Sequence, residues 1–420
     1  MNSLIKSVTI LDKNSEFHNN KVDILIENGI IINIDFNINN PKNFKEINLP
    51  NLHVSKGWFD SSVSFGEPGY EDRETIKNGL KVASKSGFTA IALQPNTNPV
   101  INTRSQVEYI KHKCINNQVE IFPIGALTKS ESNPVLTEMF DMKNGGAICF
   151  GDYKKSIKNP NTLKLALQYT APFDGIVLSY PEDDVLSNSG VVNENITSTS
   201  LGLKGNPSLA EEVQIMRDLS ILDYTGGKLH IPTISTSRSV ELIRDAKANK
   251  LDVTCSVAIH NLFFSDSMLL NFNTNFKVQP PLRTKKDIES LINGVKDGTI
   301  DMVTSDHNPL NIEQKKTEFD NAGFGTIGLE SSFGALNSIF STKMSIKLLT
   351  AGRYIFNIPE KKIEIGEVAN LTLFNPNKEF VFTNKNIYSK SKNSIFLGTK
   401  LRGKVYGIIN KNYLSISNAK

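Results

Sequence analysis

Two aspartates lie in motifs that could bind a cation or move a proton. Asp152 follows Phe150-Gly151, and Asp306 lies within Thr304-Ser305-Asp306-His307. Two carboxylates are too few for zinc, which takes three or four protein ligands with nitrogen or sulfur among them. They could together hold a hard cation that keeps several waters. The alternative for Asp306 is structural: a buried carboxylate that hydrogen-bonds the backbone at the end of a strand.

Ser62 and Ser64 form a second pair whose spacing matters. Residues two apart on a strand point to the same face, so both hydroxyls are expected on one side. As nucleophiles they would need an adjacent base, which the sequence does not supply. The chain also lacks a Gly-x-Ser-x-Gly elbow. We therefore do not interpret either serine as a nucleophile.

The scaffold for these residues is indicated by the apolar pattern. Between residues 56 and 357, short apolar runs alternate with longer amphipathic stretches. One example is the strand-like Gly175–Leu178, which is followed by the helical pattern of Leu209–Tyr224. Alternation of strand and helix over this length favours a parallel sheet closed as a (β/α)8 barrel, with its first strand at Gly57–Phe65. Reactive side chains in such a barrel lie at the carboxyl ends of the strands.

Both ends of the chain are rich in short strands instead. Near the start, Asn28-Gly29 separates two β-type runs, which is the signal for a two-residue hairpin turn. Strand character returns after Gly366. The sequence therefore predicts an α/β protein with a TIM-type barrel over 53–360, and with a small β-sandwich that 1–52 and 361–420 build jointly.

Composition narrows the classes of function. Of 420 residues, 39% are hydrophobic and 21% charged, and the net charge is only +4, which gives no reason to expect a nucleic-acid partner. No apolar stretch reaches the ~20 residues that a membrane span needs. The three cysteines are far apart and form no CxxC pair, which is typical of free thiols in a reducing compartment. We expect a cytoplasmic protein.

A series of motifs along the chain resembles one family. The motifs occur in Gly57–Gly69, Pro95–Pro99, Pro181–Asp183, Val278–Arg283, Thr304–Pro309, Phe324–Glu330 and Gly366–Phe374. In this order and spacing they resemble the class I dihydroorotases of the amidohydrolase superfamily. The resemblance covers nearly the whole chain, and it implies the same barrel with a metal site at its mouth.

The resemblance also implies that the metal ligands have been replaced. Active relatives bind zinc, which lowers the pKa of a bridging water. The positions that bind metal in the family are occupied here by Ser62, Ser64, Asp152, Tyr180, Thr233 and Asp306. Only the two aspartates match family ligands, and four histidines are missing. We therefore expect no metal or other cofactor, and we expect Asp306, the family's acid–base residue, to be vestigial.

The substrate pocket of the family is altered in the same way. The arginine that grips a substrate carboxylate falls on Gly66, an asparagine falls on Gln279 and a closing histidine falls on Leu310. Asn96 keeps the family residue. Losing the arginine removes the bidentate donor that a carboxylate prefers.

A rebuilt histidine site is an alternative, because His230, His260 and His307 lie near strand ends. However, His230 precedes the family position at Thr233 by three residues, an odd offset that should turn it to the other face. The other two match residues that bind no metal in relatives. We do not expect these histidines to form a metal site.

The resulting hypothesis is a dihydroorotase-like protein linked to pyrimidine biosynthesis that is catalytically inactive and acts as a structural or regulatory partner. The resemblance suggests a homodimer, or a complex with aspartate carbamoyltransferase or another enzyme of that pathway. One alternative is an active hydrolase of cyclic amides, converting dihydroorotate to N-carbamoyl-aspartate with an altered metal site. A third hypothesis is a small-molecule binding protein that uses the mouth of the barrel.

Overall fold

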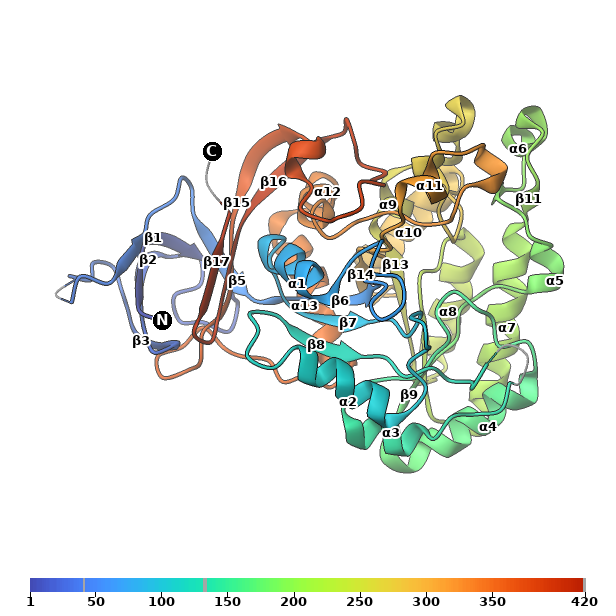
Figure 1. The fold of residues 1–420 in the computed structure, drawn as a ribbon, viewed down its shortest axis with the longest axis horizontal. Helices are drawn as coiled ribbons and strands as arrows, with labels where there is room; N and C mark the ends of the chain where they lie inside the picture. Colours follow the sequence, from blue (N-terminus) through green and yellow to red (C-terminus); the bar gives the residue numbers. More distant parts are fainter. Residues whose placement is uncertain (41, 131–133, 418–420) are drawn as a thin grey trace.

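The computed structural model describes residues 1–40, 42–130 and 134–417. It divides into a sheet built by the two chain ends and a barrel beside it (Figure 1). The blue N-terminal strands and the red C-terminal strands lie together at one side of the molecule, next to both termini (Figure 1). The predicted union of the two ends is therefore confirmed.

The end sheet contains eight strands in the described part of the chain, in the order β17-β16-β15-β5-β1-β2-β3 with β4 pairing to β1. At the turn between β2 and β3, Asn28 and Gly29 have φ of 51° and 77°, as a two-residue hairpin of this type requires. The strands are β1 (Ser3–Ile10), β2 (Lys21–Glu27), β3 (Ile30–Asp35), β4 (Lys45–Ile47), β5 (His53–Lys56), β15 (Asn370–Val381), β16 (Lys400–Asn410) and β17 (Tyr413–Ile416).

The barrel strands are parallel, and they form two arcs, β6-β7-β8 and β9-β12-β13-β14. Bridges from Phe150 to Gly125 and to Val177 join the arcs on one side, and a bridge from Val63 to His307 closes the other. The (β/α)8 barrel is thus confirmed. Seven of its strands are β6 (Trp58–Val63), β7 (Phe88–Leu93), β8 (Glu120–Pro123), β9 (Ile176–Leu178), β12 (Lys228–Ile231), β13 (Val253–Ala258) and β14 (Met302–Thr304). The eighth position, between β8 and β9, is formed by the bridges of Phe150.

Helices surround the barrel strands (Figure 1). Many begin at a polar cap, such as Thr75, whose side chain accepts the Asn78 N–H at the start of α1. The helices are α1 (Ile76–Lys85), α2 (Arg104–Lys113), α3 (Met139–Gly145), α4 (Pro160–Thr170), α5 (Asp184–Ser187), α6 (Ile196–Leu201), α7 (Ser208–Thr225), α8 (Ser237–Ala248), α9 (Ile259–Phe263), α10 (Lys285–Asp297), α11 (Ile312–Lys315), α12 (Ser332–Ile339) and α13 (Thr342–Ile355). A short pair, β10 (Val192–Asn193) and β11 (Gly205–Asn206), lies near α6.

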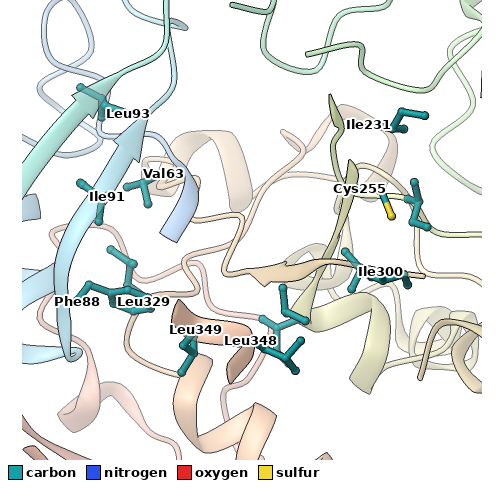
Figure 2. Packing of buried hydrophobic residues seen from close by; sticks show 14 of the residues in the cluster. Val63, Phe88, Ile91, Leu93, Ile231, Cys255, Ile300, Leu329, Leu348 and Leu349 are labelled. Carbon is teal, nitrogen blue, oxygen red and sulfur yellow. The ribbon is translucent and has the colours of Figure 1, made fainter. Parts of the chain in front are cut away.

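The main core lies between the barrel strands and the helices. Figure 2 shows Phe88, Ile91 and Leu93 of β7 in the same cluster as Leu348 and Leu349 of α13. Buried aliphatic and aromatic side chains of this kind hold the barrel without any contribution from the residues at its mouth.

Trp58 connects the barrel to the end sheet. It is fully buried, and its ring packs against Phe333 of α12 and Phe374 of β15 at centroid distances of 4.8 and 5.6 Å. Since Phe374 belongs to the end sheet and Phe333 to the barrel, one aromatic cluster ties the two parts together.

None of the helices in the described residues is both long and apolar enough to cross a membrane.

Candidate functional site

The mouth of the barrel brings together residues that the sequence analysis singled out. A small cavity of about 30 Å³ lies there, at the carboxyl ends of the strands. Its lining consists of Ser62, Gln94, Gly151, Asp152, Tyr153, Lys154, Leu178, Tyr180, Pro232, Thr233 and Asp306. Five of the six positions assigned to metal therefore converge. Ser64 is not among the lining residues, and its N–H donates to the His307 carbonyl at 2.8 Å.

Lys154 is the cation that faces Asp306. Its Nζ lies 2.7 Å from Asp306 Oδ2, and the two side chains are only 9% and 1% exposed. Burial raises the pKa of the Asp306 carboxyl, while the ammonium beside it acts in the opposite direction. The positive charge that a metal ion would supply to this carboxylate thus comes from the chain itself.

Hydroxyl groups complete the surroundings of Asp306. The Ser62 hydroxyl donates to Oδ1 at 3.2 Å, and the Tyr153 hydroxyl donates to the same oxygen at 3.5 Å. Gln94 Nε2 in turn donates to Ser62 Oγ at 3.2 Å. Asp306 itself has φ of 48°, a left-handed conformation that is uncommon outside glycine. This network fixes the carboxylate in one orientation.

Asp60 holds β6 against the end of β14. Its carboxylate accepts the N–H of Ser62 at 2.9 Å, the hydroxyl of Thr304 at 2.6 Å and the N–H of Ser305 at 2.8 Å. Burial raises the pKa of this carboxyl. Asp60 therefore positions the backbone on both sides of the Ser62–Asp306 contact.

Asp152 is bound to the loop after β8. Oδ1 accepts the N–H groups of Leu127 and Thr128 at 3.0 and 3.2 Å, and Oδ2 accepts the Thr128 hydroxyl at 2.7 Å. Burial raises the pKa of the Asp152 carboxyl, and these hydrogen bonds partly offset the shift. Both oxygens are thus already engaged.

Tyr180 and Thr233 contribute only neutral groups. Tyr180 is 4% exposed, and burial raises the pKa of its phenol well above the usual value, so the hydroxyl stays protonated. Thr233 has φ of 50°, and its N–H donates to Ser256 Oγ at 3.1 Å. Neither side chain can replace an imidazole as a metal ligand at neutral pH.

His230, His260 and His307 are buried, and burial lowers the pKa of each to about 3, so all are neutral at pH 7. In the described part of the chain, none of them lines the mouth cavity. His307 Nδ1 instead accepts the N–H of Gly328 at 3.2 Å, and its ring packs edge-on against Phe65.

The Ser256 hydroxyl lies 3.3 Å from His230 Nε2, and it also accepts the backbone N–H of Thr233. The shared contact involves the side chain of His230 but only the main chain of Thr233. Thr233 lines the mouth cavity and His230 does not, in keeping with the predicted difference in orientation.

The residues that the sequence analysis assigned to a substrate pocket do not line one cavity. Gln279 Nε2 donates a hydrogen bond to Glu182 Oε1 at 3.2 Å. Leu310 is 5% exposed, and its backbone N–H donates to Asn393 Oδ1 at 3.2 Å. Asn96 lines a separate, larger cavity of about 560 Å³.

Gly66 cannot carry a side chain in this conformation. Its φ is 96°, and a Cβ there would lie 2.6 Å from the Tyr70 carbonyl oxygen. The backbone of the loop after β6 therefore disfavours an arginine side chain at this position.

Two buried lysines hold the loops near Leu310 and Gln279, and we call them the lysine clasp: Lys277 and Lys315. Lys315 Nζ donates to the carbonyls of Thr274 and Lys277 at 2.8 and 3.1 Å. Lys277 Nζ donates to the carbonyls of Phe319 and Asp320, both at 2.8 Å. Each ammonium thus binds main-chain oxygens of the loop that carries the other.

Sequence reasoning missed Lys154, Gln94, Asp60 and the lysine clasp. The one available signal was for Lys154, which lies two residues after Asp152 and so near a strand end. The others carry no local signal, because their partners are far away in the chain.

The mouth does not fit a zinc ion. Its donors are hydroxyls from Ser62, Tyr180 and Thr233, together with two carboxylates that are already engaged by Lys154 and by the loop after β8. Among the described residues there is no group of three or more histidines, cysteines, aspartates or glutamates placed to hold a metal. Metal binding has to be measured on the protein, and its absence stays a prediction.

Comparison with solved structures supports the architecture. L-hydantoinase (dihydropyrimidinase) from Arthrobacter aurescens superposes with a TM-score of 0.86 at 19% identity, covering 100% of this chain and 96% of that one. D-hydantoinase (dihydropyrimidinase) from Thermus sp. gives a TM-score of 0.82 at 18% identity, covering 100% of this chain and 96% of that one. At these identities the likeness shows the fold alone.

Proteins found by sequence comparison are more similar to this chain than these solved structures are. The Dihydro-orotase-like family profile matches residues 53–239. The dihydroorotase of Thermoanaerobacter sp. (strain X514) is 38% identical over 413 residues, 96% of this chain and 95% of the relative. That of Ruminiclostridium cellulolyticum is also 38% identical over 413 residues, 96% of each chain. Similarity at this level over almost the full length means that the chain belongs to the dihydroorotase family.

Proposed function

We propose that this protein is a non-catalytic member of the dihydroorotase family that serves pyrimidine biosynthesis as a structural or regulatory partner. The observation that carries the proposal is the buried ion pair between Lys154 and Asp306. Asp306 stands at the family's acid–base and metal-ligand position, and an ammonium 2.7 Å away leaves it neither a free base nor a free ligand.

The size of the mouth cavity supports the same proposal. Its volume of about 30 Å³ is far below the roughly 300–1,000 Å³ of pockets that hold small organic molecules. The space beside Asp306 is therefore too small for a cyclic amide while Lys154 keeps the position that the structure shows. The chemistry of the family needs a metal-bound hydroxide at this position, which the surrounding hydroxyls cannot generate.

The competing function is hydrolysis of a cyclic amide with an altered metal site. Its support is the presence of Asp152 and Asp306, together with relatives that carry the name dihydroorotase. The two functions differ in metal content and turnover. We expect elemental analysis of the purified protein to find far less than one equivalent of zinc, manganese or iron. We also expect ring opening of dihydroorotate to stay at background.

A designed variant sharpens this test. Replacing Ser62 and Ser64 by histidine should not restore activity. Tyr180 and Thr233 would still provide no imidazole ligand, and Lys154 would still pair with Asp306. Stoichiometric metal, measurable turnover by the unmodified protein, or complementation of a strain without dihydroorotase would each overturn the proposal.

The surface beside Leu310 supports a role in assembly. A hollow of about 940 Å³ is lined by the loop after β6, through Asp72, and by the loop around Leu310. Asn311 Nδ2 donates to Asp72 Oδ2 at 2.7 Å, which joins the two loops. Phe272 and Ile312 line this hollow with exposed fractions of 46% and 72%. Exposed apolar side chains that gather around one hollow are typical of interfaces.

The first candidate for the partner is aspartate carbamoyltransferase, and the second is another copy of this chain. A stable complex would bury on the order of 1,600 Å² and persist in size-exclusion chromatography. Ile312→Asp should abolish a complex formed at this surface. The control Tyr354→Asp changes a residue of α13 that is 89% exposed and does not line this hollow. A monomer that retains no pathway enzyme would refute the partner role.

A further inference from the structure

The hollow beside Leu310 has more basic than acidic side chains in its lining. Its volume is about 940 Å³. The basic side chains that line it are Lys315, Lys316, Lys390 and Lys392. Its acidic side chains belong to Asp72 and Glu318. Burial lowers the pKa of Lys315 to about 7, but even without this residue the lysines outnumber the carboxylates.

The two carboxylates do not neutralise these lysines. Asp72 Oδ2 accepts a hydrogen bond from Asn311 Nδ2 at 2.7 Å, and Glu318 Oε2 accepts one from the Thr317 hydroxyl at 2.9 Å. In the part of the chain that the structure describes, neither carboxylate forms an ion pair with a lysine of this lining. The hollow therefore attracts negative charge.

Main-chain oxygens hold two of the ammonium groups in position. Lys390 Nζ donates to the Glu71 carbonyl at 2.8 Å, and Lys392 Nζ donates to the carbonyls of Ser389 and Ile387 at 2.7 and 3.1 Å. An ammonium has three N–H donors. Within the described residues, each group thus keeps at least one N–H for a carboxylate oxygen of another molecule.

The segment 389–393, which carries both of these lysines, is fastened to the barrel loops. The Ser391 hydroxyl donates to the Arg73 carbonyl at 2.8 Å, and Asn393 Nδ2 donates to the Asn308 carbonyl at 3.2 Å. A wall that is already held in place loses less conformational entropy when a partner binds.

The same hollow also exposes apolar side chains. Phe272 and Ile312 line it, with exposed fractions of 46% and 72%. A phosphate group or a nucleic-acid backbone would satisfy the lysines but would leave these two side chains in water. A polypeptide segment that carries both carboxylates and an apolar side chain matches both features of the lining.

We propose that this hollow binds an acidic segment of a partner protein, whose carboxylates meet Lys390 and Lys392 while an apolar side chain meets Phe272 and Ile312. The inference rests on the proposed function, because it names the chemistry of the partner that the assembly role requires. Charge pairs at an exposed surface are screened by salt, so binding should weaken as the ionic strength rises.

Fluorescence anisotropy with the full-length protein tests the proposal. The probe is a fluorescein-labelled peptide in which leucines are placed among aspartates and glutamates. We expect this peptide to bind, and its affinity to fall about tenfold between about 50 mM and about 300 mM NaCl. A peptide with lysines in place of the acidic residues should not bind. If the acidic peptide does not bind, or if the basic peptide binds equally well, the proposal fails.

Lysine variants locate the charged contacts. Glutamine keeps an N–H donor for the main-chain oxygens but removes the charge, so Lys390→Gln and Lys392→Gln should each weaken binding by about twofold to fivefold. Lys143→Gln is the matched control, since Lys143 is exposed on α3, also donates to a main-chain carbonyl, that of Phe173, and does not line the hollow. The same affinity in all three variants would overturn the assignment.

A second pair of variants tests the apolar contact. Ile312→Ala should weaken binding of the acidic peptide by about fivefold, because it removes apolar surface that the leucines cover. Val185→Ala is the control, since Val185 is 87% exposed on α5 and lies outside the lining of the hollow. Unchanged affinity in the Ile312 variant would refute the proposed mode of binding.

Two further measurements separate the competing explanations. A labelled single-stranded oligonucleotide should bind more weakly than the acidic peptide, and equally tight binding would show that the hollow recognises negative charge alone, against the proposal. Turnover of dihydroorotate by a protein that still binds the acidic peptide would refute the inactive function and leave the docking chemistry standing. A partner complex that resists both salt and Lys390→Gln would overturn this inference and leave the assembly role standing.

Discussion

Lys154 and Asp306 form a buried ion pair at the mouth of the barrel. A buried ion pair contributes little relative to an apolar pair, but removing one partner leaves an uncompensated buried charge. We predict that Lys154→Met lowers the free energy of unfolding by about 3–5 kcal/mol at pH 7. Urea denaturation followed by circular dichroism measures this loss.

Two further variants test whether charge is the cause. The double variant Lys154→Met with Asp306→Asn should lose much less stability than Lys154→Met alone, since no charge then remains buried. Lys158→Met is the surface control, because Lys158 and Asp184 are 77% and 38% exposed, and it should change stability by less than about 1 kcal/mol. Equal effects of Lys154→Met and Lys158→Met would contradict the prediction.

Lys315 of the lysine clasp should make stability depend on pH. Burial, together with the nearby charge of Lys277, lowers the pKa of Lys315 from 10.5 to about 7. Between these two values the unfolded chain holds a proton that the folded chain has released, so this residue contributes stability that rises with pH. Below pH 7 both states are protonated and the contribution is constant.

The measurement is the difference in unfolding free energy between the unmodified protein and Lys315→Met. We predict that this difference rises in favour of the unmodified protein from pH 7 to pH 9.5 and is flat from pH 5.5 to pH 6.5. Titrating groups that do not interact with Lys315 cancel in the difference. A flat difference over the whole range would show that the Lys315 amine has the same pKa in both states.

At the scale of elements, the loop between β6 and α1 has a backbone that disfavours an arginine side chain at Gly66. At Gly66, both the positive φ and the 2.6 Å approach of the Tyr70 carbonyl oppose any side chain. We predict that Gly66→Arg destabilises the fold and does not create a productive clamp at this position. Gly66→Ala should show the same backbone penalty without the long side chain.

Gly202→Ala serves as the matched control. Gly202 also has positive φ, of 67°, but a Cβ there would meet no atom of the described residues within 4 Å. The substitution should cost only the conformational penalty of about 1–2 kcal/mol. If Gly66→Ala costs no more than Gly202→Ala in thermal or chemical unfolding, the steric argument is wrong.

For the whole molecule, the aromatic cluster around Trp58 should make the barrel and the end sheet unfold together. Trp58 is the single tryptophan of the chain, so its fluorescence reports on this junction. We predict that Phe374→Ala lowers the free energy of unfolding by about 3–5 kcal/mol. The fluorescence and circular dichroism transitions should still coincide.

The control Phe36→Ala removes a ring that is 67% exposed, and it should change stability by no more than about 0.5 kcal/mol. If fluorescence and circular dichroism give different unfolding midpoints, the end sheet unfolds as an independent unit. That outcome would also bear on the division at residues 52 and 360, which stays a prediction.

The sequence by itself determined the fold and which residues lie at the mouth of the barrel. Local periodicity marks strands and helices because side chains alternate with period 2 or 3.6, and repeated alternation specifies a barrel. The motif series then placed Ser62, Tyr180, Thr233 and Asp306 at strand ends, and the structure brings them to one cavity.

Only the tertiary structure decided what these residues do there. The pairing of Lys154 with Asp306 and of Asp60 with Thr304 joins residues 152 and 244 positions apart, and no local pattern encodes such distant contacts. Strand ends meet only once the barrel closes, and closure sets which charges face each other across the mouth.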